Sequence, residues 1–373
     1  METLMMTATA PHPQSTTPAA RHAAGLATTV LAGHGREAVA DIAPAAFAGR
    51  NGTWNMRLRS GEKVFVKHIS AQASGPMSFG RSVAFAAFAE QSPECAPATP
   101  QLIGSDAKNG LLVFEHCPGT SLAQLLVEES MPDTFPEEAG ALLARLHAGP
   151  TFGLERSAPP SPPVEMLAVG IPHTRYLEFT VAEMALWAEL QNDRELVAAA
   201  GRLRASERKH QERPIHGDLR LDQFHLHNGS LCVLDWEEFG LGDPARDLGM
   251  LAGEWIYRAV LDTVTTRGGA SAPPARFDDE SASARIAERM AAIVPSIRRM
   301  WTSYADHANY EDPDLPVRAT AHLGWHLVDR TITRAPMVSR LPGIERAAAG
   351  VGREALLSPG HYVSALGFER TPR

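Results

Sequence analysis

The stretch PIHGDLRLDQFHL, residues 214–226, combines side chains that could carry out phosphoryl transfer. Asp218, Arg220 and Gln223 are closely spaced in it, and Asp235 closes a short apolar strand, LCVL, further along the chain. Phosphoryl transfer needs a carboxylate to accept the proton of the attacking hydroxyl, oxygen ligands for Mg²⁺, and a cation beside the transferred group. We therefore expect Asp218 to act as base, Gln223 and Asp235 as Mg²⁺ ligands, and Arg220 as a clamp on the phosphoryl group.

Other roles for the same stretch have to be weighed. Arg220 could instead form an ion pair with Asp222. His216, His225 and His227 could suggest zinc, which is usually bound by histidine together with cysteine or carboxylate. No cysteine or carboxylate has a suitable spacing to them, so a structural role is favoured for these histidines.

The order of several motifs resembles a known family. HGDLRLDQ is followed by VLDWE and GLGDPARDLG and is preceded by VFVKH. Together they resemble the aminoglycoside phosphotransferase-like branch of the protein-kinase fold, in which HGD is followed, after four residues, by Asn and then by a metal-binding Asp at the end of the next strand. The resemblance implies a bilobal α+β fold, with ATP and Mg²⁺ as cofactors. It also implies that Asp243 and Asp247, in GDPARD, tie the metal loop to the catalytic loop.

The resemblance also assigns the nucleotide site. Lys67 of VFVKH corresponds to the lysine that holds the α- and β-phosphates of ATP. Asn51, Gly52 and Asn55 would form the loop over the phosphates, although only one glycine lies in that turn.

The expected adenine site follows the strand that begins at Leu111. Backbone groups of Glu115 and Cys117 would bond the adenine, and Phe114 would line its pocket. The hinge between the two lobes is expected nearby.

Two positions depart from the family pattern. Gln223 stands where Asn is usual, with the same amide oxygen on a stem one methylene longer. Kinases also pair the ATP lysine with a glutamate on the next helix. Here Arg81 and Ser82 occupy the corresponding positions, and Glu90, near the end of that helix, is its only acidic residue.

Local patterns predict the elements that position these residues. Strands are expected at residues 55–59 and 63–69, with a Ser60-Gly61 turn between them and a helix at 78–91. Within the second strand Lys67 shares one face with apolar neighbours, because side chains alternate along a strand. A long helical region is expected at about 174–210, and the chain after residue 249 is mostly helical.

These elements divide the chain into three expected parts. They are a disordered tail at 1–22, a small β-rich N-terminal lobe with the ATP lysine at 23–116, and a large helical C-terminal lobe at 117–373.

The composition excludes several classes of function. The net charge of −8 offers no basic excess for general nucleic-acid binding. Three widely spaced cysteines indicate neither a disulfide framework nor a CxxC zinc site and favour a reducing cytoplasm. No signal peptide and no apolar run long enough for a membrane span are recognisable, so no membrane association is expected.

A narrower resemblance covers nearly the whole chain after about residue 45. GRNGTWN, HGDLRLDQFHL, LDWEEFGLGDPARDLG, GEWIYRAV and GWHLVDR together resemble the kinase subunit of class V lanthipeptide synthetases and related thioamide-peptide systems. The resemblance implies a kinase that phosphorylates Ser or Thr of a ribosomally made precursor peptide. A HopA1-like lyase partner would then eliminate phosphate to leave dehydroamino acids.

Three hypotheses therefore stand at this point. The first is the precursor-peptide kinase. The second is a small-molecule kinase that acts on a hydroxyl of an antibiotic, choline or a sugar. The third is a non-catalytic, kinase-like scaffold, which Gln223 and the missing helix acid would favour. In each catalytic case the acceptor is expected at residues 175–192 and the C-terminal helices.

Overall fold

The computed structural model describes residues 17–44, 51–69, 77–157, 159–267 and 279–369. Contacts within the chain separate two compact units. The first unit comprises residues 1–86 and 99–118, and the second comprises residues 87–98 and 119–373. Residues 87–98 were expected in the N-terminal lobe but belong to the second unit, so a single cut near residue 116 does not describe the division.

The first unit is built on a five-stranded antiparallel sheet with the order β1-β2-β3-β5-β4. Its strands are β1 (Val39–Pro44), β2 (Gly52–Leu58), β3 (Lys63–His68), β4 (Leu102–Asp106) and β5 (Leu111–Glu115). The hairpin between β2 and β3 is confirmed, and β2 begins earlier than expected, at Gly52. Gly61 has a φ of 91°, which favours glycine at this turn. Helix α3 (Ser78–Gln91) has the predicted bounds.

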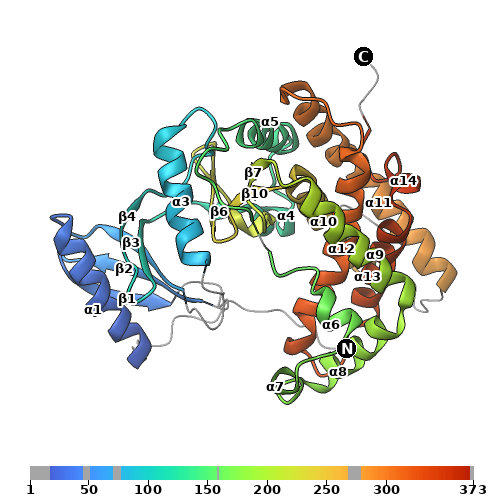
Figure 1. Ribbon diagram of the computed structural model, residues 1–373, viewed down its shortest axis with the longest axis horizontal. Helices are drawn as coiled ribbons and strands as arrows, with labels where there is room; N and C mark the ends of the chain where they lie inside the picture. Colours follow the sequence, from blue (N-terminus) through green and yellow to red (C-terminus); the bar gives the residue numbers. More distant parts are fainter. Residues whose placement is uncertain (1–16, 45–50, 70–76, 158, 268–278, 370–373) are drawn as a thin grey trace. The chain divides into compact units, whose positions relative to one another are not determined.

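Helix α1 (Pro18–Gly33) lies along one face of this sheet (Figure 1). Ala27 and Leu31 of the helix pack with Val64 and Val66 of β3 in one apolar cluster. The expectation of a disordered tail up to residue 22 is therefore wrong for residues 18–22, and residues 1–16 lie outside the described part. The helix starts early because the Thr17 hydroxyl accepts the Ala20 N–H (3.2 Å) and Pro18 is the first helical residue.

The second unit contains two small sheets that frame two loops. One sheet pairs β7 (Arg213–Ile215) with β10 (Gly240–Gly242), and the other has the order β6 (Thr120–Ser121), β8 (Phe224–His227), β9 (Ser230–Val233). The catalytic loop runs from β7 to β8 and contains the short 3₁₀ helix η1 (Leu221–Gln223). The metal loop runs from β9 to β10. Because Ile215 pairs with Gly240, the start of the catalytic loop lies beside the end of the metal loop.

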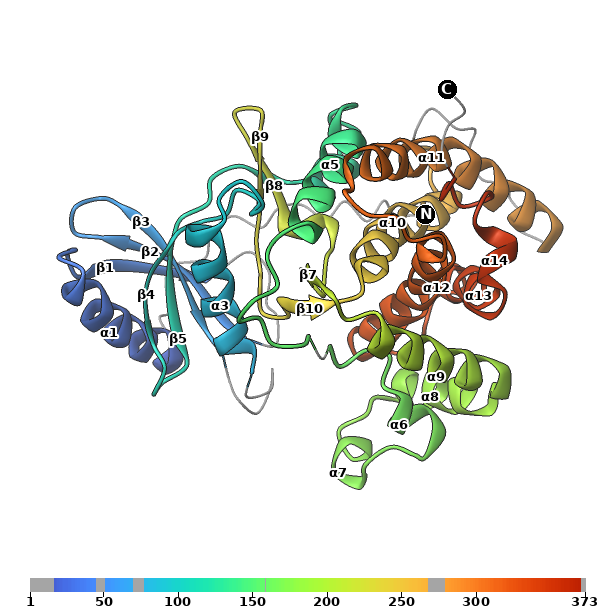
Figure 2. The ribbon, with the colours of Figure 1, turned by 45° about the horizontal axis from the view of Figure 1, so that its top comes forward.

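The rest of the second unit is mostly helical and includes the 3₁₀ helices η2 (Asp262–Val264) and η4 (Ala335–Met337). Its helices are α4 (Leu122–Val127), α5 (Phe135–His147), α6 (Val164–Ala168), α7 (His173–Tyr176), α8 (Val181–Asn192), α9 (Arg194–Lys209), α10 (Pro244–Leu261), α11 (Asp279–His307), α12 (Leu315–Arg334), α13 (Gly343–Leu357) and α14 (Pro359–Tyr362). The long helical region expected at 174–210 is thus divided among α7, α8 and α9, which Figure 2 shows grouped with α6.

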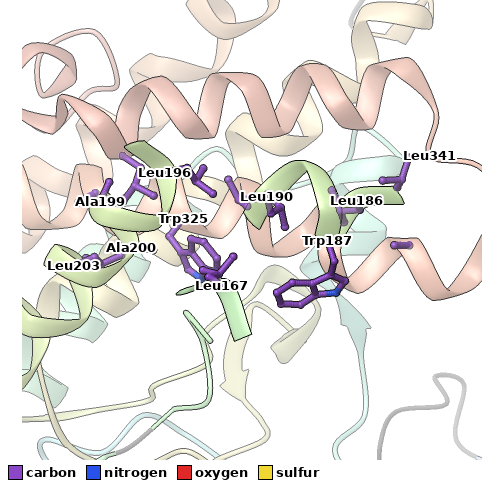
Figure 3. Close-up of a cluster of buried hydrophobic side chains, with 14 residues drawn as sticks. Leu167, Leu186, Trp187, Leu190, Leu196, Ala199, Ala200, Leu203, Trp325 and Leu341 are labelled. Atoms are coloured by element: carbon purple, nitrogen blue, oxygen red, sulfur yellow. The ribbon is translucent and has the colours of Figure 1, made fainter. Parts of the chain in front are cut away.

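An apolar cluster joins α8 and α9 to α12 and α13 (Figure 3). Trp187, Leu190 and Leu203 on α8 and α9 are buried in it together with Trp325 and Leu356 from α12 and α13. Burial of such side chains holds these helices to the helical body that carries the two loops. Among the described residues, no helix is long and apolar enough to cross a membrane.

Candidate active site

The catalytic loop presents Asp218 and Arg220 side by side. The Arg220 guanidinium lies 3.6 Å from an Asp218 oxygen, and its Nε donates to Asp222 at 3.2 Å. The Asp218 side chain is 26% exposed, so it remains open to an incoming hydroxyl group. The ion pair with Asp222 weighed above is therefore present, and the role of Arg220 as phosphoryl clamp stays a prediction.

Arg220 lies in a strongly acidic environment. Burial alone would lower the pKa of its guanidinium, but the carboxylates of Asp218, Asp222 and Asp235 outweigh burial and raise this pKa above its ordinary value. The arginine is thus a permanent cation beside the expected base.

Gln223 closes the 3₁₀ turn of the loop. Its side-chain oxygen accepts the Arg220 backbone N–H at 2.8 Å, and its own N–H donates to the Arg220 carbonyl at 3.2 Å. The residue is only 4% exposed, and its Nε2 has no hydrogen-bond partner among the described residues.

Asp235 follows β9 in a left-handed backbone conformation, with a φ of 69°. Asp tolerates this region better than most residues, and such conformations are concentrated at functional sites. The residue before it is fixed to the catalytic loop from two sides. The Leu234 N–H donates to the Gln223 carbonyl (2.9 Å), and the Leu234 carbonyl lies 2.9 Å from His216 Nε2.

Asp247 holds the backbone just before Asp218. Its carboxylate accepts the N–H groups of His216 (2.7 Å) and Gly217 (2.9 Å) and lies 3.2 Å from His147 Nε2. Burial would raise the pKa of this carboxyl group, but hydrogen bonding from His147 and the positive environment outweigh burial and lower it. The predicted tie between Asp247 and the catalytic loop is confirmed.

Gly217 is required at its position. Its φ is 86°, and a Cβ there would lie 2.6 Å from the carbonyl oxygen of Glu238. Any other residue would strain the backbone next to Asp218, the expected base.

Further polar groups support the loop from helices α10 and α12. Arg246 Nε donates to the Gly217 carbonyl (2.6 Å), and its NH1 pairs with Glu207 at 2.8 Å. Asp243 caps α10 and pairs with Arg318 at 2.7 Å. We call the buried residues around the catalytic loop the support layer. It comprises Asp243, Arg246, Glu207 and Arg318, together with Asp247 and His147.

The sequence analysis missed His147, Tyr304 and Arg318. His147 joins Asp247 on one side and the Tyr304 hydroxyl on the other, at 2.9 Å. These residues lie far from the motif along the chain, so no local pattern pointed to them.

The phosphate-binding residues expected in the first unit lie on β2 and β3. Lys67 pairs in register with Thr53 on one side and Leu112 on the other. Its side chain is 8% exposed and lies on the face opposite Val64 and Val66, as the alternation predicted. Asn51 precedes β2, while Gly52 and Asn55 lie within it. Their contact with phosphate stays a prediction.

The expected adenine site lies where β5 ends. Phe114 and Glu115 are its last two residues, and Cys117 follows. The Glu115 N–H already donates to the Gln101 carbonyl at 2.9 Å. Of the two backbone groups of Glu115, only the carbonyl therefore stays available for a hydrogen bond to adenine.

Glu90 is exposed and belongs to the second unit.

Comparison with known proteins identifies the family. Residues 53–289 match the model of the Phosphotransferase enzyme family. The chain belongs to this family. It is accordingly a kinase that transfers a phosphoryl group to a hydroxyl acceptor, with an N-terminal antiparallel sheet and a mostly helical C-terminal region.

Solved structures show the same protein-kinase-like fold at low sequence identity. A microcompartment-associated aminopropanol kinase is 13% identical with a TM-score of 0.51, covering 93% of this chain and 99% of that one. A choline/ethanolamine kinase family protein from Mesorhizobium loti is 14% identical, with a TM-score of 0.49 and coverage of 88% and 93%. An amicoumacin kinase, solved with AMP-PNP and Ca²⁺, is 13% identical, with a TM-score of 0.49 and coverage of 85% and 88%. No curated protein matches this chain.

The metal that the family implies can be tested against the residues present. Within the described ranges, no three His, Cys, Asp or Glu side chains form a group that could hold an ion. Mg²⁺ commonly binds through one or two carboxylates and takes its other ligands from phosphates and water. Asp235 fits that requirement as a single carboxylate, whereas Gln223 is buried and already bonded within its own loop.

Proposed function

We propose that this protein transfers the γ-phosphoryl group of ATP, with Mg²⁺, to a hydroxyl group of a small organic molecule. The observation that carries the proposal is the partly exposed Asp218, held beside Arg220 on a loop whose backbone is fixed by Asp247. The aminopropanol kinase of similar fold, whose name describes a small amino alcohol as acceptor, supports this class of substrate.

Each residue has a defined part in the transfer. Asp218 orients the acceptor hydroxyl and accepts its proton, and Arg220 stabilises negative charge on the transferred group. Lys67 holds the nucleotide phosphates. When bound, Mg²⁺ neutralises charge on the phosphates, and Asp235 is the side chain that would hold it.

A second candidate acceptor is a Ser or Thr of a precursor peptide. Val169, Leu177 and Val181, around α6 to α8, are at least 70% exposed, and Met337 is 67% exposed. The Thr180 hydroxyl donates to the Ala335 carbonyl at 3.5 Å, so the start of α8 lies beside η4. Exposed apolar side chains of this kind favour a partner larger than a small polar alcohol.

The two candidates have different partners. A HopA1-like lyase would be needed only for the peptide, and it stays a prediction with it. A reducing cytoplasm suits either candidate and likewise stays a prediction.

One assay separates the two acceptors. The purified protein with ATP and Mg²⁺ is offered amino alcohols, amino sugars and macrolides, and separately Ser/Thr peptides encoded beside its gene. A gain of ~80 Da, the mass of one phosphoryl group, identifies the product. A small-molecule product that is lost in Asp218→Asn supports the proposal.

Two other results would count differently. Phosphopeptide alone would replace the first candidate with the second, and Leu177→Ser should then raise the KM for peptide but not for ATP. Failure to bind ATP with Mg²⁺ would overturn both.

A further inference from the structure

Gln223 forms a reciprocal cap with Arg220. Arg220 is the residue that precedes η1, with an extended backbone (φ −141°, ψ 162°), and Gln223 is the third residue of the turn. The side chain of Gln223 reaches back to the Arg220 N–H (2.8 Å), and the Gln223 N–H donates to the Arg220 carbonyl (3.2 Å). In helix capping boxes the third residue is Glu or Gln, because its side chain must span back to the backbone of the capping residue.

The length of the glutamine therefore has a local structural reason. Asn carries the same amide on a stem one methylene shorter, so its oxygen would reach less far back toward the Arg220 N–H (2.8 Å from the Gln223 oxygen). Interchanging the amide oxygen and nitrogen of Gln223 would place an NH₂ group against the Arg220 N–H, with two donors facing each other. The amide orientation is thus fixed by the cap.

The position of the side chain also argues against metal binding. Gln223 is 4% exposed, and its oxygen already accepts a hydrogen bond from within the loop. We infer that Gln223 is a positioning residue that braces the catalytic loop, and that it is not a Mg²⁺ ligand. Only the expected changes in kcat rest on the proposed ATP-dependent reaction.

The brace connects the base to the metal loop. Arg220, whose N–H it holds, lies beside Asp218, and the Gln223 carbonyl accepts the N–H of Leu234, the residue before Asp235. A displaced turn would therefore shift the expected base, while the backbone bond from Leu234 still holds the start of the metal loop. Misplacement by about 1 Å can lower a rate by about 10²-fold.

Three variants separate bracing from ligation. Gln223→Glu keeps an acceptor at the right reach, and Gln223→Asn supplies the family amide but shortens it. Asp235→Asn replaces the charged carboxylate of the expected ligand by a neutral, weaker amide, at a position whose left-handed backbone asparagine tolerates. The readouts are the Tm without nucleotide or metal, the Mg²⁺ concentration that half-saturates ATP binding, and kcat.

For bracing, we expect Gln223→Asn to lower the metal-free Tm by about 2–4 °C. Its kcat should fall by about 10- to 100-fold, while the Mg²⁺ dependence of ATP binding stays as in the wild type. Gln223→Glu should keep a higher Tm than Gln223→Asn. Asp235→Asn should raise the Mg²⁺ requirement by about 10- to 100-fold, an effect that Gln223→Asn should lack.

The opposite pattern would overturn the inference. It consists of an unchanged Tm in Gln223→Asn, with a raised Mg²⁺ requirement in Gln223→Glu or Gln223→Asn. The melting measurement needs neither ATP nor an acceptor. A failure of the proposed function would therefore leave the test of the brace intact.

Discussion

Two aspartates of the second unit have opposite environments, although one of them binds the backbone that immediately precedes the other. Asp218, on the catalytic loop, is 26% exposed and lies beside a single arginine. Asp247, on α10, is fully buried and accepts two backbone N–H groups while also contacting His147. The contrast matches the division of work that we propose, in which partly exposed side chains of the catalytic loop carry out the chemistry and the buried support layer holds the loop in place.

The largest expected effect is on activity alone. Asp218→Asn removes the proposed proton acceptor while keeping the shape of the side chain, so kcat should fall by about 10²–10⁴-fold. The Tm should stay within about 1 °C of the wild type, because surface substitutions rarely change stability strongly. Steady-state kinetics and calorimetry on the same sample would test this, and a large fall in Tm would break the comparison.

Asp247→Asn should affect stability as well as rate. It leaves buried backbone donors imperfectly paired and removes a charge from a buried network, which typically costs about 3–5 kcal/mol. Urea unfolding measures the loss. A variant that unfolds like the wild type but is inactive would mean that Asp247 takes part in the chemistry itself.

The support layer should also make the protein sensitive to acid. Burial lowers the pKa of His322 on α12 to about 4, against the effect of Glu207, from the ordinary 6.5. The unfolded chain therefore binds this proton first as the pH falls. The contribution of His322 to the free energy of unfolding is therefore complete above about pH 6.5. It is lost between about pH 6.5 and pH 4, by roughly 3 kcal/mol in all.

Below about pH 4 this histidine contributes no further loss. Unfolding free energies between pH 7 and 4 should thus show a slope that is reduced in His322→Gln. An equal slope in the variant would assign the acid sensitivity to other groups.

The smallest effect is expected at the edge of the layer. Tyr304→Phe removes the hydroxyl bonded to His147 Nδ1 and leaves this buried nitrogen unpaired, which costs about 1–3 kcal/mol. Urea unfolding should show this loss, with a smaller change in kcat than in Asp247→Asn. An unchanged free energy of unfolding would show that the bond between Tyr304 and His147 does not contribute to stability.

Local patterns predicted much of the frame around these residues. Alternation along β3 correctly predicted which face of the strand carries Lys67. The bounds of α3 followed from helical periodicity. The tie from Asp247 to the loop was implied by the family resemblance, to which the GDPARD motif contributes. The start of α1 was missed although Thr17-Pro18 is a common N-terminal signal, because the segment before it is rich in Pro, Ser and Thr.

Long-range partners could not be predicted in the same way. His147 lies 100 residues before Asp247, and Arg318 lies 75 residues after Asp243. Only packing of α5, α10 and α12 brings them together. Gln223 was interpreted by its place in a motif, whereas its contacts depend on where a 3₁₀ turn begins, which spacing alone does not reveal.

The most direct test of the account is phosphoryl transfer from γ-labelled ATP, measured for the wild type and Asp218→Asn at equal ATP saturation. We expect labelled product from a hydroxyl acceptor with the wild type, and about 10²–10⁴-fold less with Asp218→Asn at an unchanged affinity for ATP. Equal transfer by both proteins would contradict the assignment of Asp218 as the base.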